Sequence, residues 1–260
     1  MYDTFSTNYD RFVNWDSRLA YEMPFIEAQI GGTKRPSGRK TCVLDAACGT
    51  GMHLQALAER GYKVAGADNS KGMISRTREY FVKAGLDTEL AVAGFGALEP
   101  AFNAMDSFPF DAILCLGNSL PHILSDEDLE QTLTDFGACL APGGVLMIQN
   151  RNFDAVMANK DRWMTAQSFE EDEKEWLFMR FYDLLPDGLI DFNIMTLQRD
   201  KGSEWQQDVV TTRLRPQAKA DLVSALQKAG FTNIAAYGDM TGAPFDASES
   251  GNLVVVAHKA

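Results

Sequence analysis

A short turn that contains two glycines is the first place where this sequence predicts chemistry. The segment Asp45-Ala46-Ala47-Cys48-Gly49-Thr50-Gly51 follows an apolar run and precedes an amphipathic stretch. Glycines two residues apart between a strand and a helix let a ligand approach the backbone closely. Asp68 ends the next apolar run, and its carboxylate can accept hydrogen bonds from both hydroxyls of a ribose. Together these features indicate a site for an adenosine-containing ligand.

The residues around this turn also indicate which ligand it does not suit. A dinucleotide fingerprint needs a third glycine where this chain has Leu54, and the Gly-Lys-Ser/Thr sequence of a phosphate-binding loop is missing. Asp45 stands before the turn, where its carboxylate would repel a phosphate and attract an amino group. We therefore expect a positively charged nucleoside, which disfavours a nicotinamide-dependent oxidoreductase.

Polar side chains also follow two later apolar runs. Asn118 and His122 come after one of them, and Arg151 comes after the next. Arginine is a planar fork suited to bidentate carboxylate recognition, so Arg151 is a candidate for gripping the carboxylate of a small substrate beside Asn118. Other roles remain open: an ion pair of Arg151 with Asp154 or a glutamate, a turn-capping role for Asn118, and a place in an ordinary loop for His122.

Strands and helices must alternate to bring these candidates together. Apolar runs predict strands at residues 41–47, 62–68, 90–93, 110–116 and 145–150. Amphipathic stretches predict helices at 53–60, 71–84 and 126–140. This spacing predicts right-handed crossovers and a mainly parallel sheet, at whose carboxyl edge a ligand binds.

The pattern changes after about residue 154. Residues 175–182, 189–199 and 205–214 alternate like antiparallel strands, with turns at Asp187-Gly188 and Lys201-Gly202. A helix at 217–229 and strands at 231–237 and 253–258 then follow. The expected fold class is α/β: a doubly wound, mostly parallel seven-stranded sheet with an antiparallel β insertion. The expected parts are a helical arm and linker (1–40), a cofactor-binding core (41–154), the insertion as a lid on the substrate side (155–215), and the rest of the core (216–260).

Composition restricts the class of partner. The chain has 260 residues with 24 Lys and Arg against 36 Asp and Glu, which gives a formal charge of −12. Such a surface repels nucleic acid and anionic lipid heads, and no apolar run approaches the ~20 residues of a membrane span. The four cysteines form no Cys-x-x-Cys pair, and the three histidines lack metal-ligand spacing. We expect buried reduced thiols, no metal, no signal peptide and a cytoplasmic location.

With these motifs in view, the sequence resembles a known family. Residues 43–51, Val-Leu-Asp-Ala-Ala-Cys-Gly-Thr-Gly, resemble the first motif of the class I S-adenosylmethionine-dependent methyltransferases, which have a Rossmann-like fold. Residues 116–122 and 150–154 are similar to segments of the glycine and glycine/sarcosine N-methyltransferases. Residues 9–18 resemble the arm that closes over the cofactor in that family.

The resemblance implies S-adenosylmethionine as cofactor and S-adenosylhomocysteine as product. Arg18 would bind the methionine carboxylate, Asp68 would bind the ribose, and Phe95 would lie against the adenine. Core packing is the alternative role for Phe95. The other cofactor contacts that the resemblance implies are Asp45, Ala47, Gly49, Gly51, Asn69, Met73, Gly94, Leu116 and His122.

The implied reaction is N-methylation of an amino acid or amine of the glycine or sarcosine type. Asn118 and Arg151 would hold the acceptor. Methyl transfer is an in-line displacement that depends on alignment and exclusion of water, and His122 is a candidate for taking a proton from an ammonium acceptor. The arm could reach the site of a neighbouring subunit, as it does in the family, which would make the protein a homo-oligomer.

One difference from the family leaves the acceptor open. The family has two tyrosines before a proline where this chain has Arg213-Leu214-Arg215 before Pro216, and Tyr182 and Tyr237 are candidate substitutes. The insertion also carries three tryptophans that would form an apolar lid or, in the favoured interpretation, a packing core: Trp163, Trp176 and Trp205. An oxygen, sulfur or other nitrogen acceptor, or a non-catalytic S-adenosylmethionine-binding protein, is the alternative. A nucleic-acid methyltransferase is disfavoured by the acidity and by the missing Asn/Asp-Pro-Pro-Tyr signature.

Overall fold

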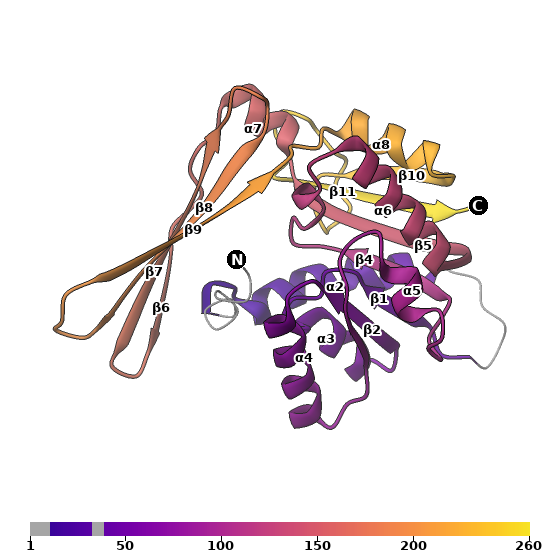
Figure 1. Cartoon of the computed structure of the whole chain (residues 1–260), viewed down its shortest axis with the longest axis horizontal. Helices are drawn as coiled ribbons and strands as arrows, with labels where there is room; N and C mark the ends of the chain where they lie inside the picture. The colour runs from indigo at the N-terminus through magenta and orange to yellow at the C-terminus, as the bar shows by residue number, and fades with distance from the viewer. Residues whose placement is uncertain (1–10, 33–38) are drawn as a thin grey trace.

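The computed structural model describes residues 11–32 and 39–260 of the chain. Within them, a seven-stranded sheet with helices on both faces forms the body of the molecule (Figure 1). A second, four-stranded sheet extends away from this body. Residues 1–10 and 33–38 of the predicted arm and linker lie outside the described residues.

The first part of the chain builds the parallel strands of the larger sheet. Helix α2 (Trp15–Gly31) precedes them. The strands are β1 (Cys42–Asp45), β2 (Lys63–Asp68), β3 (Glu89–Val92), β4 (Phe110–Cys115) and β5 (Leu140–Arg151). The connecting elements are α3 (Met52–Glu59), α4 (Lys71–Ala84), α5 (Leu98–Phe102), the 3-10 helix η1 (Leu120–His122) and α6 (Asp126–Cys139).

The end of the chain completes this sheet through α8 (Lys219–Lys228), β10 (Phe231–Tyr237) and β11 (Asn252–Lys259). The strand order is β3-β2-β1-β4-β5-β11-β10, and only β11 runs antiparallel to its neighbours. The predicted α/β class is therefore confirmed. The order reverses between β1 and β4, so the connections after these two strands leave toward opposite faces and open a crevice at the carboxyl edge.

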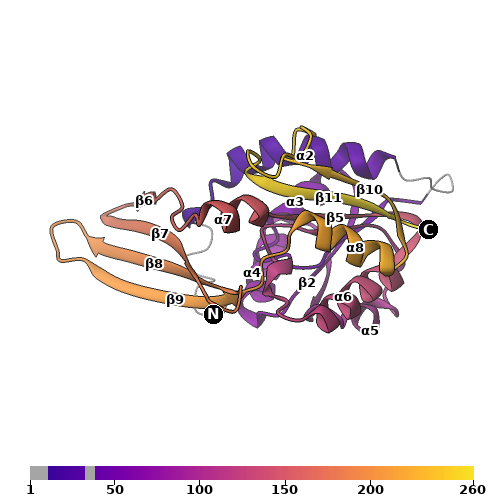
Figure 2. The same ribbon diagram turned by 90° about the horizontal axis from the view of Figure 1, so that it is seen from above.

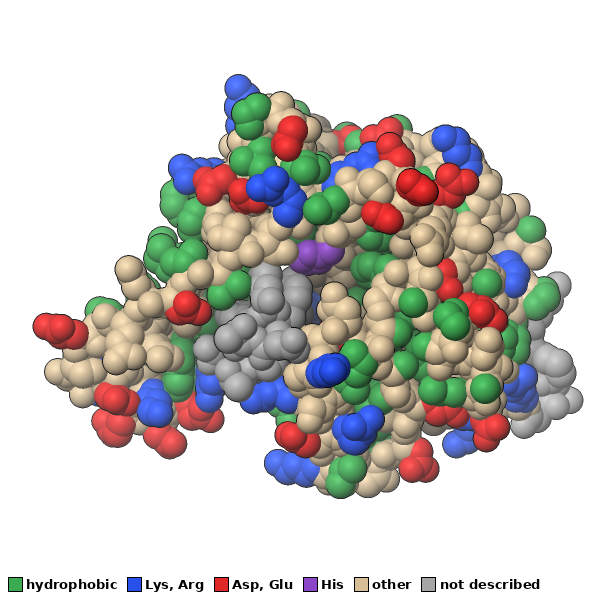
Figure 3. Space-filling model, in the orientation of Figure 1, with side chains coloured by type: hydrophobic (Ala, Val, Ile, Leu, Met, Phe, Trp, Pro, Cys, Tyr) green, Lys and Arg blue, Asp and Glu red, His purple; other side chains and the backbone are tan. Residues whose placement is uncertain are grey.

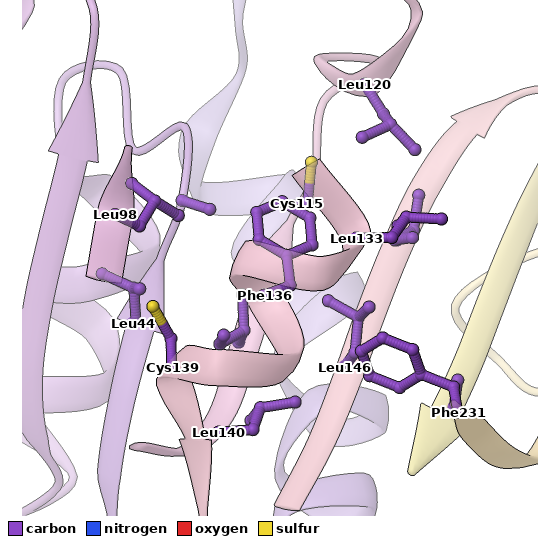
Figure 4. Close-up of a cluster of buried hydrophobic side chains, with 14 of the residues drawn as sticks. Leu44, Leu98, Cys115, Leu120, Leu133, Phe136, Cys139, Leu140, Leu146 and Phe231 are labelled. Carbon is purple, nitrogen blue, oxygen red and sulfur yellow. The ribbon is translucent and has the colours of Figure 1, made fainter. Parts of the chain in front are cut away.

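Hydrophobic layers cover both faces of the sheet. In β1, Val43 packs in the layer formed by α2, α3 and α4, whereas Leu44 packs in the layer formed by α5, α6 and α8. Figure 4 shows the second layer, with Phe136 of α6 among side chains of the strands. Because both faces are buried, the strands read as continuous apolar runs, which is why the sequence predicted them.

The four-stranded sheet is an antiparallel meander. Its strands are β6 (Gln167–Glu171), β7 (Lys174–Leu184), β8 (Ile190–Asp200) and β9 (Gln206–Leu214), and α7 (Phe153–Asn159) leads into it from β5. Figure 2 shows the sheet projecting from the end of the body. At its near end Tyr182, Ile190 and Leu214 pack with Phe153, so a small second core joins this sheet to α7.

Four elements and several boundaries differ from the prediction. The sequence patterns did not predict α5, η1, α7 or β6. Strand β6 has Phe169 as its single apolar residue, so its sequence lacks the alternation of apolar and polar residues that identifies a half-buried strand. Strand β5 begins at Leu140, where the helix was expected to end, since Leu140 pairs with Phe110 before a register shift.

Two further observations concern the thiols and the helices. Cys42, Cys48, Cys115 and Cys139 are buried free thiols, as predicted. Among the residues that the structure describes, no helix is both long and apolar enough to cross a membrane.

Candidate active site

A cavity of about 1300 Å³ lies at the carboxyl ends of β1, β2, β4 and β5. Helix α2 contributes Arg18 and Glu22 to its wall, and the four-stranded sheet contributes Arg180 and Tyr182. In Figure 3 the molecule is hollowed where that sheet meets the body. The cavity therefore joins the predicted cofactor-binding edge to the predicted insertion.

The glycine turn after β1 has a backbone that other residues adopt poorly. Gly49 and Gly51 have φ of 55° and 81°, both in the left-handed region. A Cβ on Gly51 would lie 2.4 Å from Cγ2 of Thr77, whose hydroxyl donates to the Gly49 carbonyl at 2.9 Å. Both conformational freedom and the close approach of α4 thus require glycine at position 51.

Replacing Gly51 with alanine should destabilise the protein more than replacing Gly61. Gly61 also has a left-handed φ, of 90°, but nothing lies within 4 Å of its added Cβ. Both variants carry backbone strain of about 1–3 kcal/mol, and only Gly51→Ala also collides with Thr77. Urea unfolding should show the larger loss for Gly51→Ala and partial rescue when Thr77→Ser removes Cγ2. Equal losses in the two alanine variants would show that the contact with α4 does not matter.

Asp68 is fixed at the end of β2. Its Oδ2 accepts a hydrogen bond from the backbone N–H of Gly49 at 3.0 Å, and its Oδ1 accepts one from Ser70 at 2.9 Å. The carboxylate is half-buried in the cavity wall, directly beside the turn. Two backbone N–H groups therefore fix the orientation of this carboxylate at the cavity wall.

Asp45 lies behind the cavity wall. Its side chain is buried and accepts a hydrogen bond from the backbone N–H of Ala47 at 3.2 Å. Burial raises the pKa of this carboxyl to about 6, although the electrostatic effect of His53 and the Ala47 hydrogen bond oppose the rise. Asp45 is thus a costly buried acid that supports the turn, and it does not line the cavity.

Asp45→Asn should stabilise the ligand-free protein at pH 7.5. The pKa of Asp45 is about 6 in the folded state against an ordinary 3.8. Between these values the folded protein holds a proton that the unfolded chain has lost, so wild-type stability falls as pH rises and the loss is complete above pH ~6. The gain in free energy of unfolding should be about 2 kcal/mol larger at pH 7.5 than at pH 4.5. Urea titrations at both values test this, and a pH-independent gain would contradict it.

Helix α2 is attached to the site by hydrogen bonds among three ionisable side chains. Nε of Arg18 donates to both carboxylate oxygens of Glu22 at 3.0 and 3.1 Å, and Glu22 lies 2.6 Å from Nε2 of His53 on α3. Burial alone would raise the pKa of Glu22, but the hydrogen bond to His53 and the charge of Arg18 lower it overall. A Cβ on Gly117 would be 3.7 Å from Nη2 of Arg18, so the guanidinium reaches the end of β4.

Asn118 holds the loops after β4 and β5 together. It has a left-handed φ of 64°, and its side-chain oxygen accepts a hydrogen bond from the backbone N–H of Arg151 at 2.9 Å. Its own N–H donates to the carbonyl of Gln149 at 3.0 Å. The oxygen is therefore occupied by the fold, and the amide NH₂ is the part that could serve a ligand.

Arg151 ends β5 in the cavity wall, and its Nε is buried without a hydrogen-bond partner. The alternative ion pair with Asp154 is not among the salt bridges of the described residues. Asp154 instead accepts a hydrogen bond from the backbone N–H of Lys219 at 3.0 Å. A buried donor with no partner is costly, which points to a ligand that satisfies it.

His122 also lines the cavity, at the end of η1. Its Nδ1 lies 3.5 Å from the hydroxyl of Thr212 on β9. Burial lowers the pKa of His122 to about 4, so the ring is neutral at pH 7 and is a weaker base than free histidine.

Most of the predicted residues meet in this cavity. Its wall includes Arg18, Ala47, Gly49, Asp68, Asn69, Met73, Gly94, Phe95, Asn118, His122 and Arg151. Phe95 fits both of its predicted roles, cavity lining and core packing. It lines the cavity, and its ring contacts Phe136 edge-on, with 5.8 Å between the ring centroids. Asp45, Gly51 and Leu116 do not line the cavity; Leu116 packs instead in the layer beneath α2 and α3.

Several wall residues were missed by the sequence analysis, including Glu22, Gln149, Arg180 and Thr212. The four-residue spacing of Arg18 and Glu22 on a helix was a usable signal for their ion pair. Of the two candidate tyrosines, Tyr182 lines the cavity, whereas Tyr237 packs on Phe25. None of the insertion tryptophans lines it: Trp176 is buried in the second sheet, and Trp163 and Trp205 are exposed.

Comparison with known proteins agrees with this geometry. Residues 43–144 match the family described as a methyltransferase domain. The fold is similar to that of an S-adenosylmethionine-dependent methyltransferase from Clostridium acetobutylicum ATCC 824, with a TM-score of 0.76, 19% identity and coverage of 100% of this chain and 99% of that one. Residues 43–144 are therefore similar to a methyltransferase domain, and the fold of the chain is similar to that of an S-adenosylmethionine-dependent methyltransferase. S-adenosylmethionine-bound CalS10, an amino pentose methyltransferase from Micromonospora echinaspora, has the same fold, with a TM-score of 0.72, 19% identity and coverage of 99% and 97%.

The relatives found by sequence similarity have names that state a methyl acceptor. A glycine/sarcosine N-methyltransferase from Halorhodospira halochloris is 34% identical over 155 residues, which cover 60% of this chain and 54% of that protein. One from Aphanothece halophytica is 29% identical over 239 residues, which cover 90% and 81%. This chain thus matches about half the length of the first relative and most of the second.

Proposed function

We propose that this protein transfers a methyl group from S-adenosylmethionine to the nitrogen of a small amino acid or amine of the glycine or sarcosine type. The observation that carries the proposal is a single cavity with Asp68 at the end of β2 and Arg151 at the end of β5. A group that fixes a ribose and a group that grips a carboxylate then face the same enclosed space. The glycine/sarcosine N-methyltransferases among the relatives support the acceptor class.

The residues near the turn fit this cofactor. Asp68 and Glu22 stand in the wall, and Asp45 lies just behind it. These carboxylates suit the sulfonium and ammonium of S-adenosylmethionine better than a pyrophosphate. Arg18 adds one positive charge for the methionine carboxylate. When bound, the cofactor supplies a methyl group that its sulfonium has already activated.

The protein's own contribution is to position the acceptor and exclude water. Arg151 would hold a carboxylate, and the free amide NH₂ of Asn118 would direct the acceptor toward the end of β4. Alignment of this kind can supply roughly 7–11 kcal/mol of barrier reduction. His122 is neutral at pH 7, so it can accept a hydrogen bond from an amine, but its lowered pKa makes it a weak proton acceptor.

A screen of acceptors tests the proposal. The protein is incubated with S-adenosylmethionine and separately with glycine, sarcosine, other amino acids, simple amines, amino sugars, alcohols and thiols, and mass spectrometry detects methylated products. We expect transfer to a small amine that carries a carboxylate. Transfer to oxygen or sulfur alone would contradict the acceptor class. Calorimetric binding of S-adenosylhomocysteine without any transfer would instead favour a non-catalytic binding protein.

A further inference from the structure

The four-stranded sheet has one face toward the cavity and one face away from it. Side chains alternate between the two faces of a strand, so Arg180 and Tyr182 of β7, which line the cavity, mark the inner face. The residues that alternate with them on β7 belong to the outer face. The register of the sheet extends this outer face to β8 and β9, since Met179 pairs with Met195 and Met195 pairs with Val209.

The middle of the outer face is apolar. Met179 and Met195 are the central residues of β7 and β8. The other apolar side chains of this face are Leu177, Phe181, Leu197, Val209 and Trp163. Val209 is 46% exposed and Trp163 is 62% exposed, and no described helix lies over the far half of the sheet in Figures 1 and 2. A contiguous apolar surface of this kind indicates an interaction site.

Charged side chains lie at both ends of this apolar surface, and their signs are balanced. They form ion pairs of 2.7 Å, which are Arg199 with Glu175 at the tip of the sheet, and Arg213 with Asp191 and Arg162 with Asp183 at its near end. The whole chain, in contrast, has a formal charge of −12. Two copies that meet through this face therefore avoid the like-charge repulsion that acidic surfaces would cause. The charge distribution thus favours a second copy of the chain as the partner.

The size of the outer face also suits a second copy. The four strands contain 5 to 11 residues each. With about 3.3 Å per residue and about 4.8 Å between strands, they present about 600 Å² of sheet. Two copies would bury about 1,200 Å² in total, which reaches the lower limit for specific, stable interfaces.

We propose that the outer face of the four-stranded sheet is the contact surface of a homodimer, in which the sheets of two copies pack face to face across a two-fold axis. Sheets packed in this way keep their strand directions within about 30° of each other. With the axis across the strands, the tip of each sheet lies over the near end of the other, so the two bodies stand at opposite ends and do not collide. Met179, Met195 and Val209 then lie near the axis, opposite the same residues of the second copy. The cavity is on the inner face, so this dimer leaves it accessible.

The test compares Val209→Glu with Val82→Glu. Val209 lies beside the centre of the outer face, whereas Val82 is a 75% exposed valine of α4 in the body of the molecule. Sedimentation equilibrium at micromolar concentrations measures the mass of the particle and the Kd of the dimer. We expect wild-type protein and Val82→Glu to have twice the mass of one chain. Val209→Glu should raise the dimer Kd by about 100-fold or more, because two carboxylates would meet in an apolar contact. Far-UV circular dichroism checks that the variants are folded.

A charge-swap experiment tests the two-fold arrangement. Val209→Glu and Val209→Lys should each be monomeric alone, and an equal mixture should form a heterodimer, because opposite charges then face each other across the axis. Native mass spectrometry detects that heterodimer, and a mixture that stays monomeric overturns the proposed arrangement.

Two results would overturn the homodimer itself. One is wild-type protein that stays monomeric at micromolar concentrations, as it would if this face bound a different protein. The other is a dimer that a folded Val209→Glu variant leaves intact. These measurements involve neither S-adenosylmethionine nor methyl transfer, so this inference and the proposed function can fail independently.

Discussion

Asp68→Ala should reduce affinity for S-adenosylhomocysteine by a factor on the order of 100 or more. The carboxylate is held by the N–H groups of Gly49 and Ser70 and faces the cavity beside the turn. Its loss removes the two hydrogen bonds that the ribose hydroxyls would donate to a charged acceptor, and it leaves the backbone N–H groups of Gly49 and Ser70 without this partner. Hydrogen bonds to charged groups contribute about 1.5–3 kcal/mol each, which gives the expected factor. Isothermal titration calorimetry measures it directly.

Two further variants test whether the loss of affinity is specific to the carboxylate of Asp68. Asp68→Asn keeps one acceptor oxygen and should lose less affinity than Asp68→Ala. Asp87→Asn removes a carboxylate at an exposed position away from the cavity and should bind like wild type. Circular dichroism must show that each variant is folded. A folded Asp68→Ala protein with wild-type affinity would remove Asp68 from the cofactor site.

The parallel half of the fold was predictable because burial on both faces leaves a simple trace in the sequence. The residues of β1 and β4 are buried throughout, and the helix predicted at 71–84 has the bounds of α4. The glycine turn was predictable for a related reason, since a left-handed φ and a close contact with Thr77 leave glycine as the fitting residue at position 51. Backbone conformation and burial along the chain were therefore enough to predict these parts of the fold.

The remaining features depend on contacts between distant segments. One of the partners of Glu22 is His53, which lies thirty-one residues away in the sequence, and no local sequence pattern connects the two residues. Asn118 was predicted as a ligand-binding or capping residue, but the pairing of its oxygen with the N–H of Arg151 follows from the adjacency of β4 and β5. Asp45 was predicted to contact the ligand, but its side chain is buried and does not line the cavity, so this contact stays a prediction.

The two sheets supply different residues of the cavity wall. The seven-stranded sheet supplies Asp68 and the turn, which the sequence motif already indicated. The four-stranded sheet supplies Arg180 and Tyr182, whose relation to the cavity depends on the packing of Tyr182 against Phe153. The glycine turn and Asp68 are thus close together in sequence, whereas the part of the cavity wall that the four-stranded sheet supplies comes from residues far along the chain. We therefore expect the acceptor to be the property that sequence resemblance alone predicts least well.

Arg151→Lys should lower kcat/KM for a carboxylate-bearing acceptor by about 100-fold while leaving the affinity for S-adenosylhomocysteine unchanged. Lysine keeps the positive charge but lacks the planar fork and the fixed Nε–H, which in the wild type is buried without a protein partner. Loss of one buried, charge-assisted contact costs about 2–3 kcal/mol, which corresponds to this factor. Arg162→Lys is the matched control, because Arg162 pairs with Asp183 at an exposed position outside the cavity wall. Steady-state kinetics and calorimetry test the pair, and an Arg151→Lys enzyme with full turnover would show that the acceptor is held by other residues.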